Sequence, residues 1–582
     1  MSAASISRGG DGDAGALRAI IAEAIACEPL DARALDRILR RHPKAGRGFY
    51  SKREVLAAFR AEPDAWPLAE AAFAEKLRTT PTRTLSGVAP VAVLTKPFPC
   101  PGRCVFCPSD VRMPKSYLAS EPGCQRAQAN RFDPYLQAWN RLAAFRAMGH
   151  STAKVELIVL GGTWSFYPES YQVWFATRLF EALNDFGAGL DRRSEVDEFA
   201  PDFSGLALGP RGYDAGVAAH LRAGEAGELI PPRERGEWSA LEAAQRVNEN
   251  AGARCVGLAL ETRPDHVTLE EVLRLRRLGA TKLQLGIQSL DDAVLAANER
   301  GHGVAATRTA IGLLRGAGFK IHAHWMANLL GSTAERDRVD FARLFDDPAI
   351  RPDELKLYPC SLVETAELVQ HHARGEWRAY TRDELLPLVA DCLAAIPRWC
   401  RATRVIRDIP SQEIVTGSRE TNLREAAEAL LRARGVPLQE IRSREVREAR
   451  AGGELTLRET RYATSIGEEI FVEALTGADR LAGFARIALP SAPFADAPPI
   501  DELRRCALLR EVHVYGAVAD LGERAPNKSQ HAGLGARLVA RSADLARAGG
   551  FPQLSVISAV GTRTWYRRQG FTDGALYQHL AL

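Results

Sequence analysis

The stretch Cys100-Pro-Gly-Arg-Cys104-Val-Phe-Cys107 carries the strongest signal for the fold of this chain. Three residues separate the first cysteine from the second, and two separate the second from the third. Three thiolates on one short segment can bind three irons of a 4Fe-4S cluster and leave the fourth iron open to a substrate. The segment therefore predicts a reactive iron–sulfur centre bound by Cys100, Cys104 and Cys107.

The spacing resembles the radical S-adenosylmethionine (SAM) signature, in which the open iron binds the amino and carboxylate groups of SAM. Reductive cleavage of SAM then yields a 5'-deoxyadenosyl radical, while the protein supplies position and shielding. A structural zinc loop is the alternative, but such a site normally has four ligands. Cys124 is a candidate fourth ligand, although no Cys or His is paired with it at finger spacing.

Size and composition describe a globular protein of two or three domains, because 582 residues exceed what one core usually supports. The hydrophobic content is 46% and the charged content 25%, which is ordinary for a soluble chain. Ten cysteines in this length do not form a disulfide framework, and a cluster loop favours a reducing compartment. No run of 18 apolar residues and no secretory leader occurs, so we expect a cytoplasmic protein with no membrane contact.

The N-terminal region, residues 1–80, reads as short helices with a strongly basic run. Residues 37–53 contain seven Lys or Arg and no Asp or Glu. Such a run can neutralise nucleic-acid phosphates, and a solvated basic face is the alternative. The candidate RNA-binding residues are Arg40, Arg41, Lys44, Arg47, Lys52 and Arg53.

From residue 81 to 400, apolar runs alternate with amphipathic stretches. This order of strand and helix predicts a parallel sheet that is partly closed into a TIM-like barrel. The predicted strands are 88–94, 155–160, 256–260, 282–287, 320–326 and 354–358. The cysteine segment follows the first strand, at the end where barrels place their active sites. The Gly- and Pro-rich stretch 190–237 is predicted to be a surface insertion.

Polar groups at the ends of the predicted strands are candidates for binding SAM. Gly161-Gly162 follows one strand and admits a close ligand, while Glu261 and Gln288 end two others. Turn formation and salt bridges at the barrel rim are the alternatives. Lys154, at the start of a strand, is a candidate coenzyme contact or a solvated lysine.

An Arg- and Glu-rich linker is expected at 401–450, followed by a second α/β domain at 451–582. There Gln530-His531-Ala532-Gly533-Leu534-Gly535-Ala536 opens a predicted helix, where consecutive amides can hold a pyrophosphate. The Gln-x-x-Gly-x-Gly form resembles the acetyl-CoA loop of GNAT acetyltransferases. Tyr566 lies where these enzymes often place a proton donor for the departing thiolate, and a packing tyrosine is the alternative.

A radical SAM barrel joined to a GNAT domain resembles the catalytic subunit of Elongator, from about residue 75 to the C-terminus with an interruption at 190–237. Further matching motifs are Arg83-Thr84-Leu85-Ser86-Gly87, Glu261–Asp265, Arg300-Gly301-His302, Leu355–Pro359, Arg407–Pro410 and Arg510–Gly516. The resemblance implies a tRNA-modifying enzyme that installs a carboxymethyl group on carbon 5 of the wobble uridine. In the family's proposed mechanism, the deoxyadenosyl radical takes hydrogen from the methyl group of acetyl-CoA, the carbon radical adds to uracil, and hydrolysis releases CoA.

By position, the resemblance also implies which residues contact acetyl-CoA and which partners are needed. The coenzyme residues are Lys154, Glu511, Val512, His513, Val514, Gln530, Gly533, Leu534, Gly535, Ala536 and Tyr566. The expected partners are the anticodon stem-loop of tRNA, whose wobble base must flip into the barrel mouth, and an electron donor. A homo-oligomer is compatible with the sequence.

Three positions depart from the family pattern. The gap between the first two cluster cysteines is often longer in relatives, and Trp565-Tyr566 replaces a Tyr-Tyr pair, which leaves Tyr566 as the acid. Residues 441–447 lack the cysteines that hold a structural metal in many bacterial relatives, so no zinc is expected there. A protein lysine acetyltransferase with a structural iron–sulfur cluster is the main rival function, and a non-catalytic RNA-binding module is the other.

Overall fold

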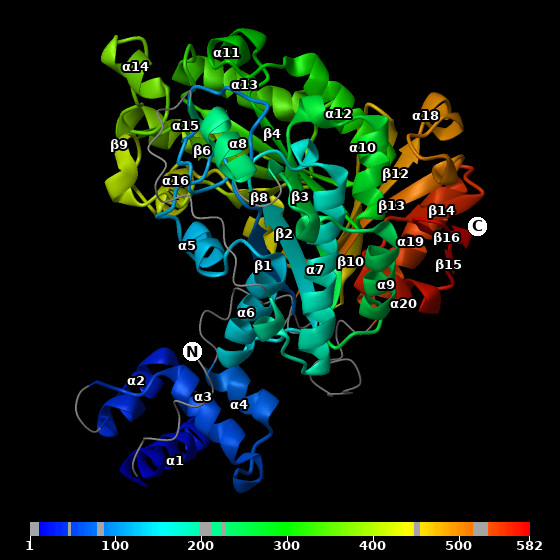
Figure 1. The fold of residues 1–582 in the computed structure, drawn as a ribbon. Helices are drawn as coiled ribbons and strands as arrows, with labels where there is room; N and C mark the ends of the chain where they lie inside the picture. Colours follow the sequence, from blue (N-terminus) through cyan, green and yellow to red (C-terminus); the bar gives the residue numbers. More distant parts are fainter. Residues whose placement is uncertain are drawn as a thin grey trace.

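The computed structural model describes residues 11–28, 30–44, 48–77, 87–196, 212–223, 227–446, 454–515 and 533–582. Figure 1 shows a small helical module at the N-terminus, a curled parallel sheet surrounded by helices, and a second sheet packed against it. This arrangement confirms the expected fold class, a partial barrel followed by an α/β domain.

The N-terminal module has a hydrophobic core of its own, formed by residues that include Ile20, Leu35, Phe59 and Phe73. Its helices are α1 (Asp11–Ala26), α2 (Ala32–Arg41), α3 (Lys52–Ala61) and α4 (Glu70–Leu77). Helix α3 begins with a capping box between Ser51 and Glu54, which satisfies free amides of its first turn. The described module therefore holds helices where the sequence predicted them.

The barrel sheet is parallel throughout, in the order β1-β2-β3-β4-β5-β6-β8, and it is open between β1 and β8. The strands are β1 (Ala89–Leu94), β2 (Lys154–Leu160), β3 (Arg254–Thr262), β4 (Lys282–Gln288), β5 (Lys320–Ala327), β6 (Glu354–Pro359) and β8 (Arg401–Arg404). Six of them match the predicted strands. Strand β8 lies within the stretch 401–450 that the sequence assigned to a linker. Its backbone pairs with β6, and four residues rich in arginine give no apolar signal.

Helices cover the outer face of this sheet (Figure 1). The described helices of this part of the chain, apart from α8, are α5 (Pro122–Ala129), α6 (Pro134–Ala147), α7 (Glu169–Ala188), α9 (Trp238–Asn248), α10 (Leu269–Arg277), α11 (Asp292–Ala297), α12 (Val304–Gly316), α13 (Ala334–Asp346), α14 (Leu368–Ala373), α15 (Arg382–Ala395), α16 (Leu423–Ala433) and α17 (Ile441–Arg444). A small antiparallel pair, β7 (Leu362–Val363) and β9 (Ile414–Thr416), lies beyond the carboxyl end of β6.

The stretch 190–237 is not purely a surface insertion, contrary to the sequence prediction. Its helix α8 (Tyr213–Ala223) buries Tyr213 and Val217 in the barrel core. The Asp214 Oδ1 atom accepts a hydrogen bond from the Cys100 amide at 2.8 Å, and the Tyr213 hydroxyl donates to the Met113 carbonyl at 2.7 Å. The insertion therefore supports the cysteine segment. Its polar composition hid the few apolar residues that anchor it.

The second sheet has the order β10-β11-β12-β13-β14-β16-β15. Its strands are β10 (Thr456–Thr464), β11 (Gly467–Leu475), β12 (Leu481–Pro490), β13 (Cys506–Val514), β14 (Gln553–Val556), β15 (Thr572–Asp573) and β16 (Gln578–Ala581), with helices α18 (Ala492–Asp496), α19 (Leu534–Ala548) and α20 (Arg563–Arg568). Strands β13 and β14 pair in parallel only from Cys506 to Leu509. Beyond that point β13 continues to Val514 paired with β12 but no longer with β14, so β13 and β14 separate.

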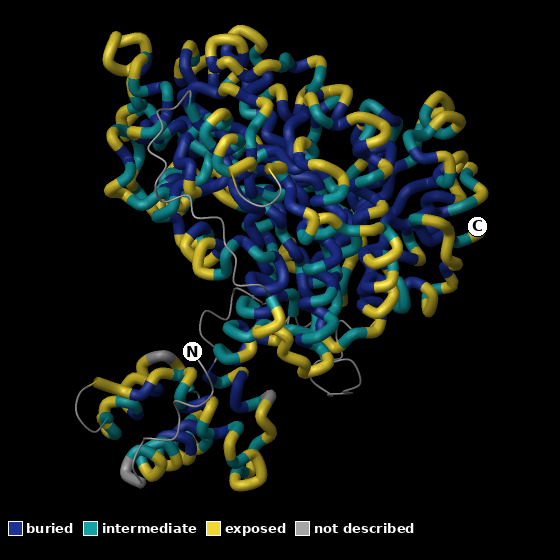
Figure 2. The backbone as a smooth tube through the Cα atoms, in the orientation of Figure 1, coloured by how far each residue is buried: buried dark blue, intermediate teal, exposed yellow. Residues whose placement is uncertain are grey.

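The barrel and the second sheet share one continuous hydrophobic core, visible as the dark band between them in Figure 2. Buried residues from both sides belong to it, for example Leu508, Ile557 and Tyr577 from the second sheet. The buried Arg276 crosses the boundary and donates to the carbonyls of Ser558 and Leu576, at 2.7 and 2.8 Å from Nη2. Among the described helices, none combines the length and apolar character needed to cross a bilayer.

Candidate functional site

The cysteine segment leaves the carboxyl end of β1 and brings three thiols to one cavity of about 190 Å³. Cys104 is buried, and its sulfur lies 3.0 Å from Arg300 Nη1 and 3.8 Å from Arg263 Nη1. The Cys107 thiol and then the two guanidinium groups hold the pKa of Cys104 well below its usual range, against the opposing effect of burial. This environment favours a thiolate, the form that binds iron.

The local sequence explains how Arg263 reaches the thiol. A side chain at Gly102 would overlap with the Arg263 guanidinium, so glycine at this position allows the approach. Arg263 is held in place by Asp265, at 2.7 Å between Nη2 and Oδ2, and by the Arg300 carbonyl, also at 2.7 Å. The donor set therefore fits a thiolate-bound cluster: three cysteines on one wall and two fixed cations beside them.

Cys124 does not join the other three cysteines. It packs among apolar side chains that include Leu94, Met113 and Phe132, and burial raises its pKa to about 12. Within the described ranges, no group of three His, Cys, Asp or Glu side chains converges closely enough to hold a single metal ion. The zinc alternative, which requires Cys124 as the fourth ligand, thus has no support in this geometry.

The predicted SAM-binding residues gather around the same cavity, with one exception. Gly162, Glu261 and Gln288 line it. Gly162 has φ +64°, and a β-carbon there would meet no atom within 4 Å, so the position is open to a ligand. Gly161, with φ +121°, instead packs closely against Thr95. Glycine is required at this position by the positive φ angle and by the close contact with Thr95.

Further polar groups reach this cavity from strands distant in sequence. The Tyr117 hydroxyl donates to Glu261 Oε2 at 3.2 Å, and His324 Nδ1 lies 3.7 Å from Glu261 Oε1. Tyr117 lies in an irregular segment, so no periodic pattern pointed to it. His324 is an interior residue of β5, a position that becomes visible only when the strands are arranged in a sheet.

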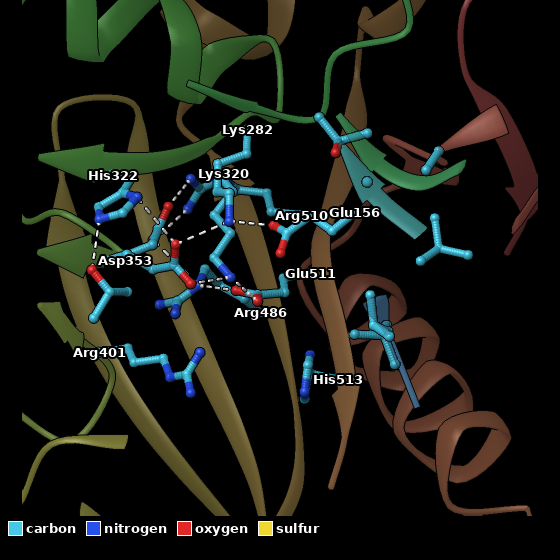
Figure 3. A pocket seen from close by; sticks show the side chains of 18 of the residues that line it. Glu156, Lys282, Lys320, His322, Asp353, Arg401, Arg486, Arg510, Glu511 and His513 are labelled. Carbon is cyan, nitrogen blue, oxygen red and sulfur yellow. Dashed lines mark hydrogen bonds and ion pairs between the residues drawn. The ribbon is translucent and has the colours of Figure 1, made fainter. Parts of the chain in front are cut away.

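A second cavity, of about 910 Å³, lies between the amino-terminal halves of the barrel strands and the second sheet (Figure 3). Barrel residues Glu156, Lys282 and Lys320 line it on one side. The predicted coenzyme residues that line it on the other side are Glu511, Val512, His513 and Tyr566.

The other predicted coenzyme residues that the structure describes do not line this cavity. Gly533, with φ +91°, precedes α19, and Leu534, Gly535 and Ala536 form its first turn. Gly535 lies against the Trp565 ring, and a β-carbon there would be 3.3 Å from the ring. Val514 ends β13, and Lys154 begins β2. Gln530 and Arg47 lie outside the described residues, as do Arg83, Thr84, Leu85, Ser86 and Gly516.

The backbone around the second cavity can bind a long polar ligand. Because β14 ends at Val556, opposite Leu509, the edge of β13 from Arg510 onwards has none of the described strands beside it on that side. Such an edge offers amides and carbonyls to an extended ligand. The first turn of α19 adds free amides, which favour a phosphate. A nucleotide coenzyme with an amide-containing arm matches both features.

Tyr566 lines the second cavity with its phenol ring. It is buried, and burial together with the Glu511 carboxylate raises its pKa far above the usual value. The phenol therefore stays protonated at neutral pH. Its neighbour Trp565 packs edge-on against it, with ring centroids 4.8 Å apart, as expected if only the second ring faces the cavity.

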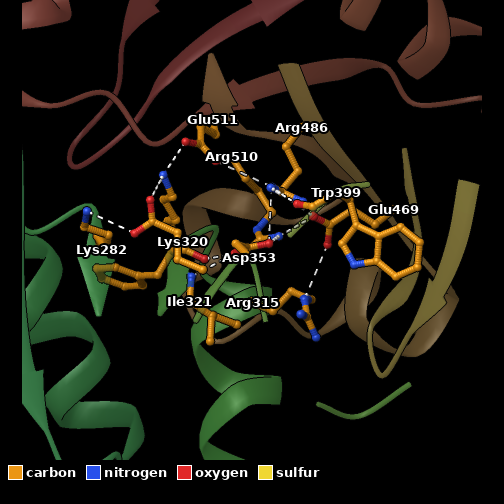
Figure 4. A network of polar contacts seen from close by, with 12 residues as sticks. Lys282, Arg315, Lys320, Ile321, Asp353, Trp399, Glu469, Arg486, Arg510 and Glu511 are labelled. Carbon is orange, nitrogen blue, oxygen red and sulfur yellow. Dashed lines mark hydrogen bonds and ion pairs between the residues drawn. The ribbon is translucent and has the colours of Figure 1, made fainter. Parts of the chain in front are cut away.

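Charged side chains connect the barrel wall to β13 (Figures 3 and 4). Lys282 Nζ lies 2.5 Å from Glu156 Oε1 and 3.2 Å from Glu354 Oε2. Lys320 Nζ lies 2.8 Å from Glu354 Oε1 and also pairs with Glu511. These ion pairs fix Glu511, and hence β13, relative to the barrel.

The two cavities meet inside the barrel. Leu160, Lys356 and Arg404 line both of them. We call this junction the neck. Groups held in the two cavities would therefore face each other across these three side chains.

The basic residues of the N-terminal module are partly neutralised. Arg40 pairs with Asp36 at 2.8 Å, Arg41 with Glu23 at 2.8 Å, and Lys44 with Glu54. In the part of the chain that the structure describes, no carboxylate oxygen lies within 4.0 Å of the charged groups of Lys52 or Arg53.

Comparison with known proteins agrees with this architecture. The family model of the Radical_SAM C-terminal domain matches residues 352–433. A tRNA uridine(34) acetyltransferase of Dehalococcoides mccartyi (strain CBDB1) is 36% identical over 508 residues, covering 86% of this chain and 99% of that protein. Elongator complex protein 3 of Danio rerio is 34% identical over 519 residues, covering 86% and 85%. A solved structure of the archaeal Methanocaldococcus infernus Elp3 with an N-terminal deletion has a TM-score of 0.66 at 30% identity, covering 86% of this chain and 100% of that one.

Proposed function

Because this chain belongs to the family of the tRNA uridine(34) acetyltransferases and Elongator complex protein 3, we propose that it attaches a carboxymethyl group to carbon 5 of the wobble uridine in tRNA. The cofactors would be a 4Fe-4S cluster, SAM and acetyl-CoA. The observation that carries the proposal is the neck, where a cysteine-lined cavity meets a cavity beside the coenzyme-like edge of β13.

On this proposal, the cysteine side of the neck holds the cluster and SAM. Cys100, Cys104 and Cys107 would bind the cluster, which with SAM supplies radical chemistry on an unreactive C–H bond. Arg263 and Arg300 keep Cys104 in the thiolate form through their positive charge. The polar groups of Gly162, Glu261 and Gln288 face the same cavity, and we assign SAM to them.

The second cavity would hold acetyl-CoA. The exposed edge from Glu511 to Val514 would bind its amide-containing arm, and the turn Gly533–Ala536, with Gln530 before it, would bind its pyrophosphate. We also retain Lys154 as a coenzyme contact. When water adds to the acyl carbon and the C–S bond of the thioester breaks, Tyr566 would give a proton to the departing thiolate.

The RNA would reach the neck as a flipped base. Chemistry on a uracil ring requires the base to leave the anticodon stack. Lys52 and Arg53 of the N-terminal module, together with Arg40, Arg41, Lys44 and Arg47, would hold phosphates of the anticodon stem-loop. A one-electron donor is needed as well, and a tRNA substrate is consistent with the cytoplasm.

The rival function is acetylation of protein lysines, with a merely structural cluster. That reaction needs an open path from solvent to the thioester. Here Glu511 and Tyr566 face a cavity whose opposite wall is the barrel interior, which favours an acceptor held within the protein. The contact of both lobes with one cavity therefore supports a reaction shared between them.

The test is an anaerobic incubation of reconstituted protein with tRNA, SAM, acetyl-CoA and dithionite, followed by nucleoside mass spectrometry. We expect a uridine heavier by one carboxymethyl substituent, and no such product from Cys104→Ala. Product formed without SAM would contradict the radical reaction, and acetylation of peptides by Cys104→Ala at the wild-type rate would favour the rival function.

A further inference from the structure

Three lysines project from neighbouring strands into the barrel interior, and one of them differs from the others. Lys282 on β4 contacts Glu156 and Glu354, and Lys320 on β5 contacts Glu354 and Glu511. Lys356 on β6 donates only to an amide, with 2.5 Å between its Nζ and Gln284 Oε1. Across the described ranges, no carboxylate oxygen lies within 4.0 Å of Lys356 Nζ.

The register of the sheet places Lys356 nearer the cysteine side than the other two. Lys282 is paired with Lys320 in register, whereas Lys356 is paired with His324, four residues further along β5. Lys356 thus sits at the neck, where it lines both cavities. The neighbouring Arg404 pairs with Asp408, which leaves Lys356 as the cation at the neck with no carboxylate partner among the described residues.

A buried ammonium group destabilises the folded protein unless a negatively charged group lies beside it. Burial disfavours the charged form of a lysine, and a carboxylate partner normally offsets that cost. The environment of Lys356 lowers its pKa to about 8, chiefly through burial, with Glu261 opposing the shift. At neutral pH it is still largely protonated and available to an anionic ligand.

We propose that Lys356 binds the carboxylate of the carboxymethyl group once that group has formed on the uridine. The inference rests on the proposed function, and it adds a binding site for the new substituent. A base in the neck would direct its 5-substituent toward the coenzyme side, because the acyl group is delivered from there. Hydrolysis of the thioester turns a neutral acyl group into an anion at that point. The unpaired ammonium then gains the partner that it lacks in the free protein.

Other anions are less well matched to Lys356. The coenzyme phosphates have a better position at the first turn of α19, where backbone amides are free. Phosphates of the RNA backbone would stay outside, since the neck lies within the barrel. The carboxylate on a 5-substituted base is one small anion, which matches the single positive charge of Lys356.

The test compares two anticodon stem-loop RNAs that differ only at the wobble position, one with uridine and one with 5-carboxymethyluridine. Binding of each to the full-length protein without cofactors is measured by fluorescence anisotropy at pH 7. We expect the wild-type protein to bind the carboxymethylated RNA about tenfold more tightly, the usual size of a hydrogen bond to a charged group. Lys356→Gln should bind both RNAs equally, and Lys356→Arg should keep part of the difference.

Arg308→Gln serves as the control, because it removes a surface cation that pairs with Asp347 and lines neither cavity. It should leave the ratio of the two affinities unchanged, whatever it does to each of them. Equal binding of both RNAs by the wild-type protein would overturn the proposal, as would a tenfold preference that persists in folded Lys356→Gln. This binding test can be distinguished from the test of the proposed function. If the mass-spectrometry assay yields no modified nucleoside but the ratio of the two affinities behaves as expected, the proposed synthase reaction is wrong and the carboxylate site is supported.

Discussion

Arg510 on the second sheet and Asp353 on the barrel form a fully buried ion pair, with 2.6 Å between Nη2 and Oδ2. Asp353 Oδ2 also accepts a hydrogen bond from the Ile321 amide at 2.8 Å, and Arg486 Nε lies 3.2 Å from Asp353 Oδ1 (Figure 4). These groups tie the start of β5 and β6 to β12 and β13 of the second sheet. The relative position of the two cavities depends on this contact.

Replacing Arg510 with methionine should therefore destabilise the protein strongly. Removal of Arg510 leaves Asp353 with Arg486 as its remaining close cation and takes a partner from Glu469 as well, at a cost of about 3–5 kcal/mol. The urea midpoint, followed by tryptophan fluorescence, measures the change. The double variant Asp353→Asn with Arg510→Met should lose less than the sum of the two single variants. Strict additivity would show that the two charges are not coupled.

Cys104→Ala should abolish cluster binding, whereas Cys124→Ala should not. Cys104 lies on the wall with Cys100 and Cys107, and Cys124 packs among apolar side chains. Iron content and visible absorbance after anaerobic reconstitution distinguish the two variants. Loss of iron in folded Cys124→Ala would mean that the fourth cysteine is a ligand after all.

Tyr566→Phe should lower kcat for release of CoA by about a hundredfold or more, with little change in KM for acetyl-CoA. Loss of a proton donor slows bond cleavage and leaves binding intact. A thiol-specific reagent reports the release. Tyr577→Phe is the control, since its hydroxyl donates to the Ala317 carbonyl at 2.7 Å and lines neither cavity. Equal rates for Tyr566→Phe and the wild-type protein would exclude the assigned role.

The stability of the second sheet should fall at alkaline pH because of His579. This histidine lies 2.9 Å from Glu502 Oε1 through Nε2 and 2.8 Å from Ser555 Oγ through Nδ1. Burial opposes its charged form, but Cys506 and Glu502 outweigh burial and raise its pKa to about 9. A histidine whose pKa is raised in the folded state stabilises the fold fully at pH values below its pKa in the unfolded chain, about 6.5. This stabilisation is lost as the pH rises through about 9.

His579→Gln should accordingly remove about 1–2 kcal/mol of the difference in unfolding free energy between pH 6.5 and pH 9.5. Urea titrations at several pH values measure it. His371→Gln, at a surface pair with Glu376, should keep the wild-type pH dependence. An unchanged pH dependence in His579→Gln would contradict the assignment to His579.

Charge reversal of Lys52 and Arg53 to glutamate should weaken tRNA binding and reduce its dependence on salt. If each side chain contacts one phosphate, the slope of log affinity against log salt should fall by about 2. Filter binding between 50 and 200 mM salt, concentrations at which this effect is large, measures the slope. Arg18→Gln, which breaks a surface pair with Glu62, should leave the slope unchanged. An unaltered slope in the double variant would assign these residues to a solvated face.

Most of the fold could be predicted because its strands are apolar and regularly spaced. The barrel strands from Ala89–Leu94 to Glu354–Pro359 lie where apolar runs predicted them. Strand β10 was missed, since its exposed edge position permits the polar sequence Thr456–Thr464. Helix α8 was also missed, because only a few apolar residues anchor it within a polar stretch. Edge strands and sparsely anchored helices give a weak periodic signal in any sequence.

By itself, the sequence determined the two ligand-binding motifs, which are three cysteines at a defined spacing and a glycine-rich helix start. It also determined the order of strands, which places each motif at the end of a strand. Their chemistry is local, since it depends on residues within a few positions of one another. Tertiary structure alone decided that two arginines flank Cys104, that the two cavities meet at Lys356, and that this lysine has no carboxylate beside it among the described residues. Such contacts join strands far apart in the chain, and only packing of the folded sheet sets the distance between their side chains.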